Sequence, residues 1–399
     1  MALSIDVLSS YPPVQEAEVD KVLAEEIRDN EKKIVVLDDD PTGVQTVHDI
    51  SVYTNWEKAS IEQGFAEENK LFYILTNSRG FTAAQTEKAH KEIAEVVDQV
   101  AKETGKEYLF ISRSDSTLRG HYPLETTILK DEYEKNTGKK IDGEVLCPFF
   151  KEGGRFTIDD VHYVQYDDTL VPAAETEFAK DKTFGYTVSN LKEYVEEKTQ
   201  GAYKKENVTA ISLENIRELN YDKIEEQLLA VEDFNKVIVN AIDYVDVKIF
   251  CVALFRAMKK GKNFMFRTAA AIVKVMGGVS NQPLLTREQM VVKETDNGGI
   301  IVVGSHTDKT TRQMEKLREN KDIAFVELNA TLVNDEAAFA EEVERCLALE
   351  EEYISSGKSV CVYTTRVLIT ADTGDKEDDL RLSVRISDAV QSLVGRLIS

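Results

Sequence analysis

Cysteine is scarce in this chain of 399 residues, and its four cysteines are scattered along the sequence. No two of them have the C-x-x-C spacing, and no histidine lies at the distance from them that a zinc knuckle needs. The sequence therefore predicts neither a disulfide framework nor a zinc site, and no metal ligand set can be assigned from it.

Long apolar runs are also missing. No uncharged apolar run approaches the roughly 20 residues that a membrane-spanning helix needs. The first 20 residues lack the basic start and the apolar stretch of a secretory signal. These absences predict a cytoplasmic protein with no membrane partner.

Basic residues are the third deficit, because 49 Lys and Arg stand against 72 Asp and Glu, a formal net charge of -23. Such an acidic surface repels phosphate backbones and anionic lipids, so nucleic acid is a poor partner. The net charge does not argue against small anions, since a local site decides whether they bind.

What is present is a repeated alternation of apolar strands and helices. After a charged helix over residues 16–33, strands are expected at 33–37, 71–75 and 108–111, with a helix at 83–103. A turn-rich stretch at 277–283 precedes further strands at 300–303, 324–328 and 359–364 and helices at 336–355 and 378–398. This alternation predicts an α/β fold of βαβ units with mainly parallel sheets flanked by helices.

The alternation also predicts the domain organisation. We expect an N-terminal helical extension over residues 1–32, a first domain over 33–280 and a second over 281–399. The oligomeric state stays open, and a homodimer is one of the options.

Each of the first three strands ends in a polar cluster, and ligands of open parallel sheets bind beyond the carboxyl ends of the strands. Asp39 and Asp40 follow the first strand. Carboxylates at this place can accept hydrogen bonds from sugar hydroxyls, bind Mg²⁺ or take up a hydroxyl proton. The alternative is an ordinary acidic turn. Arg79 follows the second strand. If the strands are neighbours, these clusters share one crevice.

The segment after the third strand, 114–121, combines an acid, hydroxyls and a guanidinium. Arg119 is suited to clamp a carboxylate or a phosphate, and Asp115 to receive a hydroxyl; a helix cap paired with Arg119 is the alternative. Arg79 and Arg155 are further candidates for an anionic substrate.

Gly304 and Ser305 lie between a strand and a helix, where backbone amides can hold a phosphate. A nicotinamide-dependent enzyme needs a G-x-G-x-x-G turn after the first strand. The sequence has Asp39-Asp40-Pro41-Thr42-Gly43 there instead, which argues against that class.

Several motifs, in order, resemble the four-carbon acid sugar kinase family over nearly the whole chain. They are Asp39-Asp40-x-Thr42-Gly43, Thr76-Asn77-Ser78-Arg79, Asp115-Ser116-Thr117-Leu118-Arg119-Gly120, Pro148 through Gly154-Arg155, Glu175-Thr176-Glu177-Phe178-Ala179-x-Asp181, and Gly304-Ser305-His306 with Thr310-Thr311-x-Gln313.

The resemblance implies an ATP- and Mg²⁺-dependent kinase that phosphorylates the terminal hydroxyl of a threonate, erythronate or 3-oxo-tetronate type of acid, with its active site in an interdomain cleft. It implies a sugar-acid site lined by Asp39, Asp40, Arg79, Asp115, Ser116, Arg119, Gly120 and Arg155. It also implies that Gly304 and Ser305 contact ATP and that Asp40 or Asp115 orients or deprotonates the attacking hydroxyl.

One departure from the family pattern concerns the end of the sequence. Family members continue past the last helix into a strand and a Gly-Gly-x-Thr-Ser type of loop that cradles ATP, and no such loop occurs before Ser399. The alternative expectation is therefore a remnant or fragment that binds the sugar acid but does not transfer phosphate.

Overall fold

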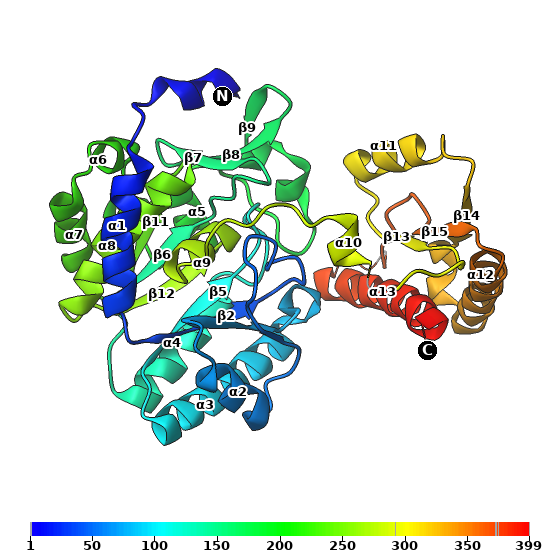
Figure 1. Ribbon diagram of the computed structural model, residues 1–399, viewed down its shortest axis with the longest axis horizontal. Helices are drawn as coiled ribbons and strands as arrows, with labels where there is room; N and C mark the ends of the chain where they lie inside the picture. Colours follow the sequence, from blue (N-terminus) through cyan, green and yellow to red (C-terminus); the bar gives the residue numbers. More distant parts are fainter. Residues whose placement is uncertain (1, 292, 372, 374, 399) are drawn as a thin grey trace. The chain divides into compact units, whose positions relative to one another are not determined.

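The structure is a computed structural model that describes residues 2–291, 293–371, 373 and 375–398. The chain divides into two compact units, Met1–Gln282 and Pro283–Ser399. Each unit has a parallel sheet flanked by helices, as Figure 1 shows. The expected α/β fold is confirmed.

The first unit holds twelve strands and nine α-helices among its described residues. Its strands are β1 (Leu3–Ser4), β2 (Lys33–Asp38), β3 (Val52–Tyr53), β4 (Leu71–Leu75), β5 (Tyr108–Arg113), β6 (Gly143–Cys147), β7 (Arg155–Ile158), β8 (Val161–Tyr166), β9 (Thr169–Pro172), β10 (Thr209–Ile211), β11 (Asn235–Val239) and β12 (Phe264–Thr268). Its helices are α1 (Glu16–Asp29), α2 (Lys58–Ala66), α3 (Ala83–Thr104), α4 (Leu124–Thr137), α5 (Leu191–Lys198), α6 (Leu213–Arg217), α7 (Tyr221–Leu229), α8 (Tyr244–Lys259) and α9 (Ala270–Met276).

Two sheets form this unit. Eight strands make a parallel sheet in the order β10-β11-β6-β12-β5-β2-β4-β3, and four make an antiparallel sheet in the order β1-β9-β8-β7. The sequence analysis missed the antiparallel sheet. Its β7–β8 turn uses Asp159 and Asp160 at φ 48° and 67°, a left-handed geometry for which glycine, absent here, is the usual signal.

The central strand β2 is buried on both faces, which explains its continuous apolar run. Ile34 and Val36 pack into a core that includes residues of α8 and α9, while Val35 and Leu37 pack into a second core with residues of α2 and α3. Figure 1 shows these two helix pairs on different sides of the sheet. Helices therefore cover β2 on both faces of the sheet.

Helix α1 ends at Asp29, four residues earlier than the sequence predicted. Asn30 has extended backbone angles, and Lys33 already belongs to β2. Buried Lys33 donates from Nζ to the carbonyl of Glu67 at 2.9 Å, which fixes the strand start. Val19 and Leu23 of α1 are buried in the core of the first unit.

The second unit has a smaller parallel sheet in the order β13-β15-β14. Its strands are β13 (Ile300–Val303), β14 (Ile323–Leu328) and β15 (Ser359–Thr364), and its helices are α10 (Arg287–Met290), α11 (Asp308–Leu317), α12 (Glu336–Ser355) and α13 (Lys376–Ile398). Short 3₁₀ helices in the two units are η1 (Ile5–Ser10), η2 (Ser78–Gly80), η3 (Ala173–Glu175), η4 (Glu177–Lys180), η5 (Lys205–Asn207) and η6 (Ala330–Asn334). Within the described part of the chain, no helix is both long and apolar enough to cross a membrane.

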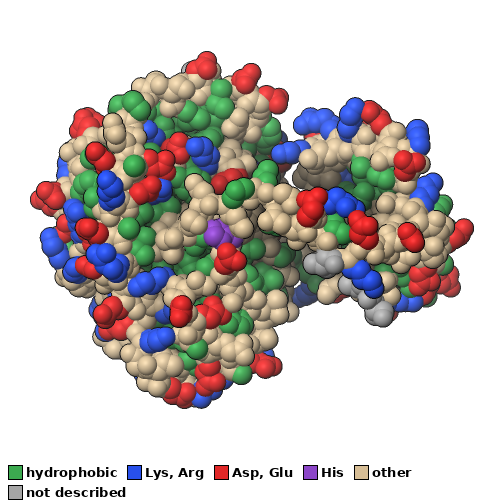
Figure 2. Space-filling view, in the orientation of Figure 1, with side chains coloured by type: hydrophobic (Ala, Val, Ile, Leu, Met, Phe, Trp, Pro, Cys, Tyr) green, Lys and Arg blue, Asp and Glu red, His purple; other side chains and the backbone are tan. Residues whose placement is uncertain are grey.

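Surface charge is mixed over the first unit. On the face shown in Figure 2, acidic and basic side chains alternate, and no continuous basic patch covers this unit. This face therefore lacks the positive stripe that nucleic-acid binding uses.

Candidate functional site

The carboxyl ends of β4, β2 and β5 lie side by side at one edge of the large sheet. Strand β2 pairs in parallel with both neighbours, and Asp38 at its end is level with Leu75 of β4 and Arg113 of β5. The three polar clusters of the sequence therefore leave adjacent strand ends. This is the edge at which open parallel sheets bind ligands.

Asp38 and Arg113 form a buried ion pair at this edge, with side chains 1% and 6% exposed. Burial raises the pKa of Asp38 to about 6 against the opposing effect of Arg113. Gly43 passes directly over the pair, since a Cβ there would lie 2.2 Å from both Arg113 Nε and Asp38 Oδ2. A larger residue at this position would displace the pair. Arg113 also donates to the carbonyl of Asp40 at 2.7 Å, so the pair supports the turn that carries Asp40.

Arg79 bridges the two candidate acids that follow β2. Its terminal nitrogens lie 2.7 Å from Asp39 Oδ1 and 2.9 Å from Asp40 Oδ2, and its Nε donates to Asp39 Oδ2 at 3.2 Å. Burial raises the pKa of Asp39 in spite of Arg79 and Arg113. Burial also acts to raise the pKa of Asp40, but Arg79 and Thr42 outweigh it and lower that pKa.

Asp115 and Arg119 pair within the loop after β5. Arg119 Nε lies 2.7 Å from Asp115 Oδ2, which also accepts from the Thr117 hydroxyl. Burial acts to raise the pKa of Asp115, but the guanidinium groups of Arg119 and Arg79 hold it well below its usual range. The carboxylate stays ionised, and among the described residues no hydrogen-bond donor reaches its Oδ1.

Arg155 is the candidate guanidinium that pairs with no carboxylate in the described part of the chain. It is the first residue of β7. Its guanidinium lies 5.5 Å from the centre of the Phe178 ring, and that of Arg119 lies 5.1 Å from the same ring. Burial lowers the pKa of Arg155, with Asp115 opposing and Arg119 adding to the effect. An anionic ligand would supply the charge that the protein does not.

Ser116 and Gly120 complete the loop after β5. The Ser116 carbonyl accepts a hydrogen bond from His162 Nε2 at 2.7 Å. Gly120 has φ 113°, and a Cβ on it would lie 2.7 Å from Ser114 Oγ and 3.2 Å from Asp39 Oδ2. The glycine therefore lets this loop lie against the segment after β2.

The structure thus gathers the candidate residues of the first unit at one strand-end cluster. Its members are Asp39, Asp40, Arg79, Asp115, Ser116, Arg119, Gly120 and Arg155. Five of them, Asp39, Asp40, Arg79, Asp115 and Arg119, are charged groups that the protein itself pairs, whereas Arg155 has no carboxylate partner among the described residues.

Gly304 and Ser305 belong to the second unit, between β13 and α11. Ser305 Oγ lies 3.2 Å from Thr307 Oγ1 and accepts from Thr310 Oγ1 at 3.1 Å. Thr307 is the N-cap of α11. Three hydroxyls therefore gather at the start of a 10-residue helix, where the free amides and the helix dipole favour an anion.

The chain's own side chains do not fit a directly held Mg²⁺ ion. In residues 2–291, 293–371, 373 and 375–398, no three His, Cys, Asp or Glu side chains come together as a cation site. The carboxylates of Asp38, Asp39 and Asp40 already face Arg113 and Arg79. The expected Mg²⁺ requirement therefore stays a prediction.

Two buried side chains that contact the loop after β5 were not predicted from the sequence. Arg267 of β12 donates to the carbonyls of Asp115 and Arg119, and His162 of β8 contacts the carbonyl of Ser116. A signal for Arg267 was available, since a single arginine interrupts the apolar run that forms β12. His162 stands in an alternating strand with no such mark.

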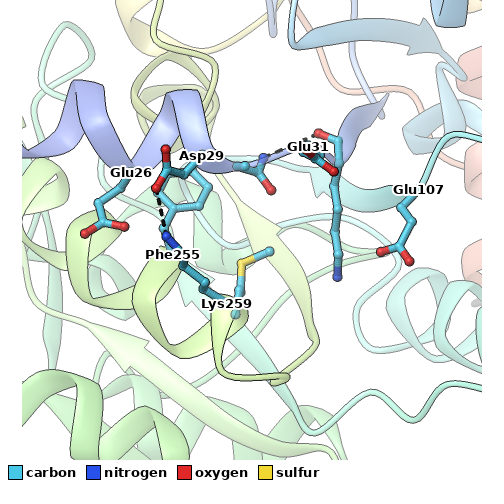
Figure 3. Close-up of a pocket in the computed structure, with 9 residues that line it drawn as sticks. Glu26, Asp29, Glu31, Glu107, Phe255 and Lys259 are labelled. Atoms are coloured by element: carbon cyan, nitrogen blue, oxygen red, sulfur yellow. Dashed lines mark hydrogen bonds and ion pairs between the residues drawn. The ribbon is translucent and has the colours of Figure 1, made fainter.

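A separate cavity of about 190 Å³ lies between the end of α1 and α8, at the opposite, amino end of the large sheet. Figure 3 shows the acids of this cavity and Lys259. Lys259 Nζ lies 2.8 Å from Asp29 Oδ2. Lys32 donates to Asn263 Oδ1 at 2.9 Å. Its lysines are already bonded within the protein, unlike Arg155 at the carboxyl end.

Two domain models match the sequence. Residues 34–276 match a sugar-binding N-terminal domain, and residues 300–399 match a nucleotide-binding C-terminal domain. No curated protein sequence matches the chain.

Solved structures are similar to the chain at low sequence identity. A Salmonella typhimurium LT2 protein with a provisional tRNA synthase name is 14% identical, with a TM-score of 0.53 over 92% of this chain and 82% of that one. A Haemophilus influenzae protein is 17% identical, with a TM-score of 0.46 over 91% and 82%. A Bordetella bronchiseptica domain of unknown function, a domain-swapped dimer with bound citrate, is 16% identical, with a TM-score of 0.45 over 92% and 80%.

Proposed function

Since this chain belongs to the four-carbon acid sugar kinase family, we propose that it transfers a phosphoryl group from ATP to the terminal hydroxyl of a four-carbon sugar acid. The substrate is a threonate, an erythronate or a 3-oxo-tetronate. The hydroxyl oxygen bonds to the terminal phosphorus of ATP, ADP leaves with the electrons of the broken P–O bond, and the hydroxyl proton is released. The reaction takes place in the cytoplasm.

The open guanidinium of Arg155 is the observation that carries this proposal. Arg79 is occupied by Asp39 and Asp40, and Arg119 by Asp115. Arg155 lacks a carboxylate partner among the described residues and lies beside the same aromatic ring as Arg119. A guanidinium binds a carboxylate through two parallel hydrogen bonds. Arg155 therefore takes the carboxylate of the sugar acid.

Asp115 accepts a hydrogen bond from a hydroxyl of the bound acid. Its Oδ2 is held by Arg119 and Thr117, and its Oδ1 is left to accept from a ligand. A carboxyl with such a low pKa is a weak base, so it orients the hydroxyl more than it removes the proton. Phosphoryl transfer depends mainly on positioning, which suits this role. Asp40 remains the second candidate for contact with the attacking hydroxyl.

The nucleotide contacts Gly304 and Ser305 in the second unit. The hydroxyls of Ser305, Thr307 and Thr310 gather at the start of α11. Free amides and the helix dipole at such a terminus attract the phosphates of a nucleotide.

The test is ADP release from the full chain with Mg-ATP and a panel of threonates, erythronates and 3-oxo-tetronates. We expect release that depends on one acid and falls at least ~100-fold in Asp115→Ala. Asp131→Ala is the control, because Asp131 is a surface residue paired with Lys130.

The other outcomes separate the alternatives. Thermal stabilisation by one acid without any ADP release would replace the kinase with an acid-binding protein that does not turn over. Absence of both release and stabilisation would reject the sugar-acid assignment.

A further inference from the structure

Arg267 is a buried cation that has no carboxylate partner in the described part of the chain. It lies in β12, level with Ser112 of β5 and Leu146 of β6, and is 2% exposed. No ion pair of the described residues includes it. A buried charge is costly unless polar groups replace the water that it loses. The polar groups that surround the guanidinium therefore indicate which part of the structure it holds in place.

The groups around Arg267 are the two ends of the substrate loop. One terminal nitrogen donates to the carbonyl of Asp115 at 3.3 Å, and the other donates to the carbonyl of Arg119 at 2.8 Å. The guanidinium carbon lies 5.6 Å from the centre of the Tyr122 ring. Arg267 thus bridges the backbone of the two residues whose side chains form the Asp115–Arg119 pair.

The carbonyls between these two ends are also held by side chains. His162 Nε2 lies 2.7 Å from the Ser116 carbonyl, while Tyr186 donates to Thr117 at 2.7 Å and Tyr194 to Leu118 at 2.8 Å. Burial lowers the pKa of His162 to about 4, so its ring is neutral, and with the proton on Nε2 it donates to Ser116. We call Arg267, His162, Tyr186 and Tyr194 the carbonyl clamp.

The clamp holds a backbone that includes one unfavourable conformation. Leu118 has φ 70°, which is unfavourable for a residue with a branched side chain. Five successive carbonyls, from Asp115 to Arg119, accept from clamp residues of β8, β12, α5 and the segment before α5. Only Arg267 contacts two of these carbonyls, and only it is charged among the four.

We propose that Arg267 is a positioning residue for the sugar-acid site: its guanidinium fixes the loop backbone that places Asp115 and Arg119. The inference rests on the proposed function for the identity of the ligand. Lysine cannot replace it, because an ammonium lacks the planar fork that reaches two carbonyls at once. A displacement of about 1 Å at such a site is enough to weaken its function ~100-fold.

The experiment compares Arg267→Lys and Arg267→Met with Arg217→Lys and Arg217→Met in the full chain. Arg217 is a matched control because it is also poorly exposed, at 9%, and binds Asp246 away from the loop. Calorimetry with D- and L-threonate and D-erythronate measures acid binding, and steady-state assays measure KM for acid and for ATP. Hydrogen exchange of the peptide covering residues 114–121 measures the loop itself.

We expect acid affinity about 10- to 100-fold weaker in both Arg267 variants, faster exchange at 114–121, and a KM for ATP within twofold of wild type. The Arg217 variants should lose stability without any of these changes. If Arg267→Met does not fold, Arg267→Lys and Tyr194→Phe decide the question, the latter with a smaller effect in the same direction.

Two results would overturn the inference. One is wild-type exchange at 114–121 in folded Arg267 variants, and the other is a loss of acid and ATP affinity in equal measure. If the wild-type chain binds none of the acids, the proposed function fails, and the exchange measurement still decides whether Arg267 positions the loop.

Discussion

Arg119 Nε lies 2.7 Å from Asp115 Oδ2, although the two residues are only four positions apart in a loop that is not helical. Arg267 holds the backbone of this pair, because its guanidinium donates hydrogen bonds to the carbonyls of both residues. Because the guanidinium groups hold the pKa of Asp115 well below its usual range, the carboxylate stays ionised, and its Oδ1 is left to accept a hydrogen bond from a ligand hydroxyl.

Replacement of Arg119 by glutamine should change the pH dependence of acid binding. The guanidinium helps to hold the pKa of Asp115 low, so its removal raises that pKa. The carboxylate then takes up a proton at a higher pH, and binding should be lost earlier as the pH falls. Calorimetry between pH 4 and pH 8 measures this shift. Arg256→Gln, on a partly exposed pair with Glu26, is the control, and an unshifted profile would count against the pairing role of Arg119.

Replacement of Arg155 by methionine should weaken binding of the sugar acid by roughly 10- to 100-fold, because hydrogen bonds to charged groups contribute about 1.5–3 kcal/mol each. The KM for ATP should stay the same. Lys151→Met on the preceding turn removes a surface ion pair with Asp243 and serves as the control. Equal acid affinity in wild type and Arg155→Met would show that another group binds the carboxylate.

Gly120→Ala should impair acid binding and lower the free energy of unfolding by about 1–3 kcal/mol. The φ of 113° is unfavourable for alanine, and its Cβ would press on Ser114 and Asp39. Gly138→Ala is the matched control, since Gly138 has φ 70° with nothing within 4 Å of an added Cβ. The Gly138→Ala variant should lower the free energy of unfolding without changing acid affinity. Urea unfolding and calorimetry on both variants measure the difference, and identical acid affinities would refute the close contact.

The second unit should lose stability as the pH rises from 5 to 8. Glu350 in α12 is fully buried, and neither carboxyl oxygen has a hydrogen-bond partner among the described residues. Burial raises its pKa to about 7. Between the unfolded value near 4.5 and 7, only the unfolded state loses the proton, so rising pH favours unfolding.

Glu350→Leu should remove this dependence, and its stabilising effect should be roughly 2–3 kcal/mol larger at pH 8 than at pH 5. Urea unfolding at both pH values provides the measurement. Glu352→Leu, at an exposed position of the same helix, is the control. The same stabilisation at both pH values would mean that Glu350 is ionised in the folded state.

The sequence predicted three of the eight strands of the large sheet, β2, β4 and β5, and the polar clusters that follow them. The apolar runs ending in Asp38, Leu75 and Arg113 became adjacent strands because alternating strands and helices favour parallel pairing. Which guanidinium was open could not be predicted. That depends on Arg79 and Arg119 folding back onto acids, and on β7 bringing Arg155 to the same aromatic ring.

Arg267 and His162 were missed for a different reason. A side chain that bonds to backbone carbonyls leaves no complementary residue type in the sequence. The carbonyl clamp became visible only when β8 and β12 were placed against the loop. The extent of helix α1 was overestimated because Lys33, a charged residue, is a buried strand residue bonded to the carbonyl of Glu67.

Under the proposed function, the two ends of the substrate would contact residues that belong to different sheets. Arg155 opens β7 of the antiparallel sheet, whereas Asp115 follows β5 of the parallel one. Under the proposed function, the distance between Arg155 and Asp115 decides which length of carbon chain fits between them. The connection between β6 and β7 sets that distance. Changing the length of this connection would therefore retune which acids are accepted while leaving the phosphoryl-transfer groups untouched.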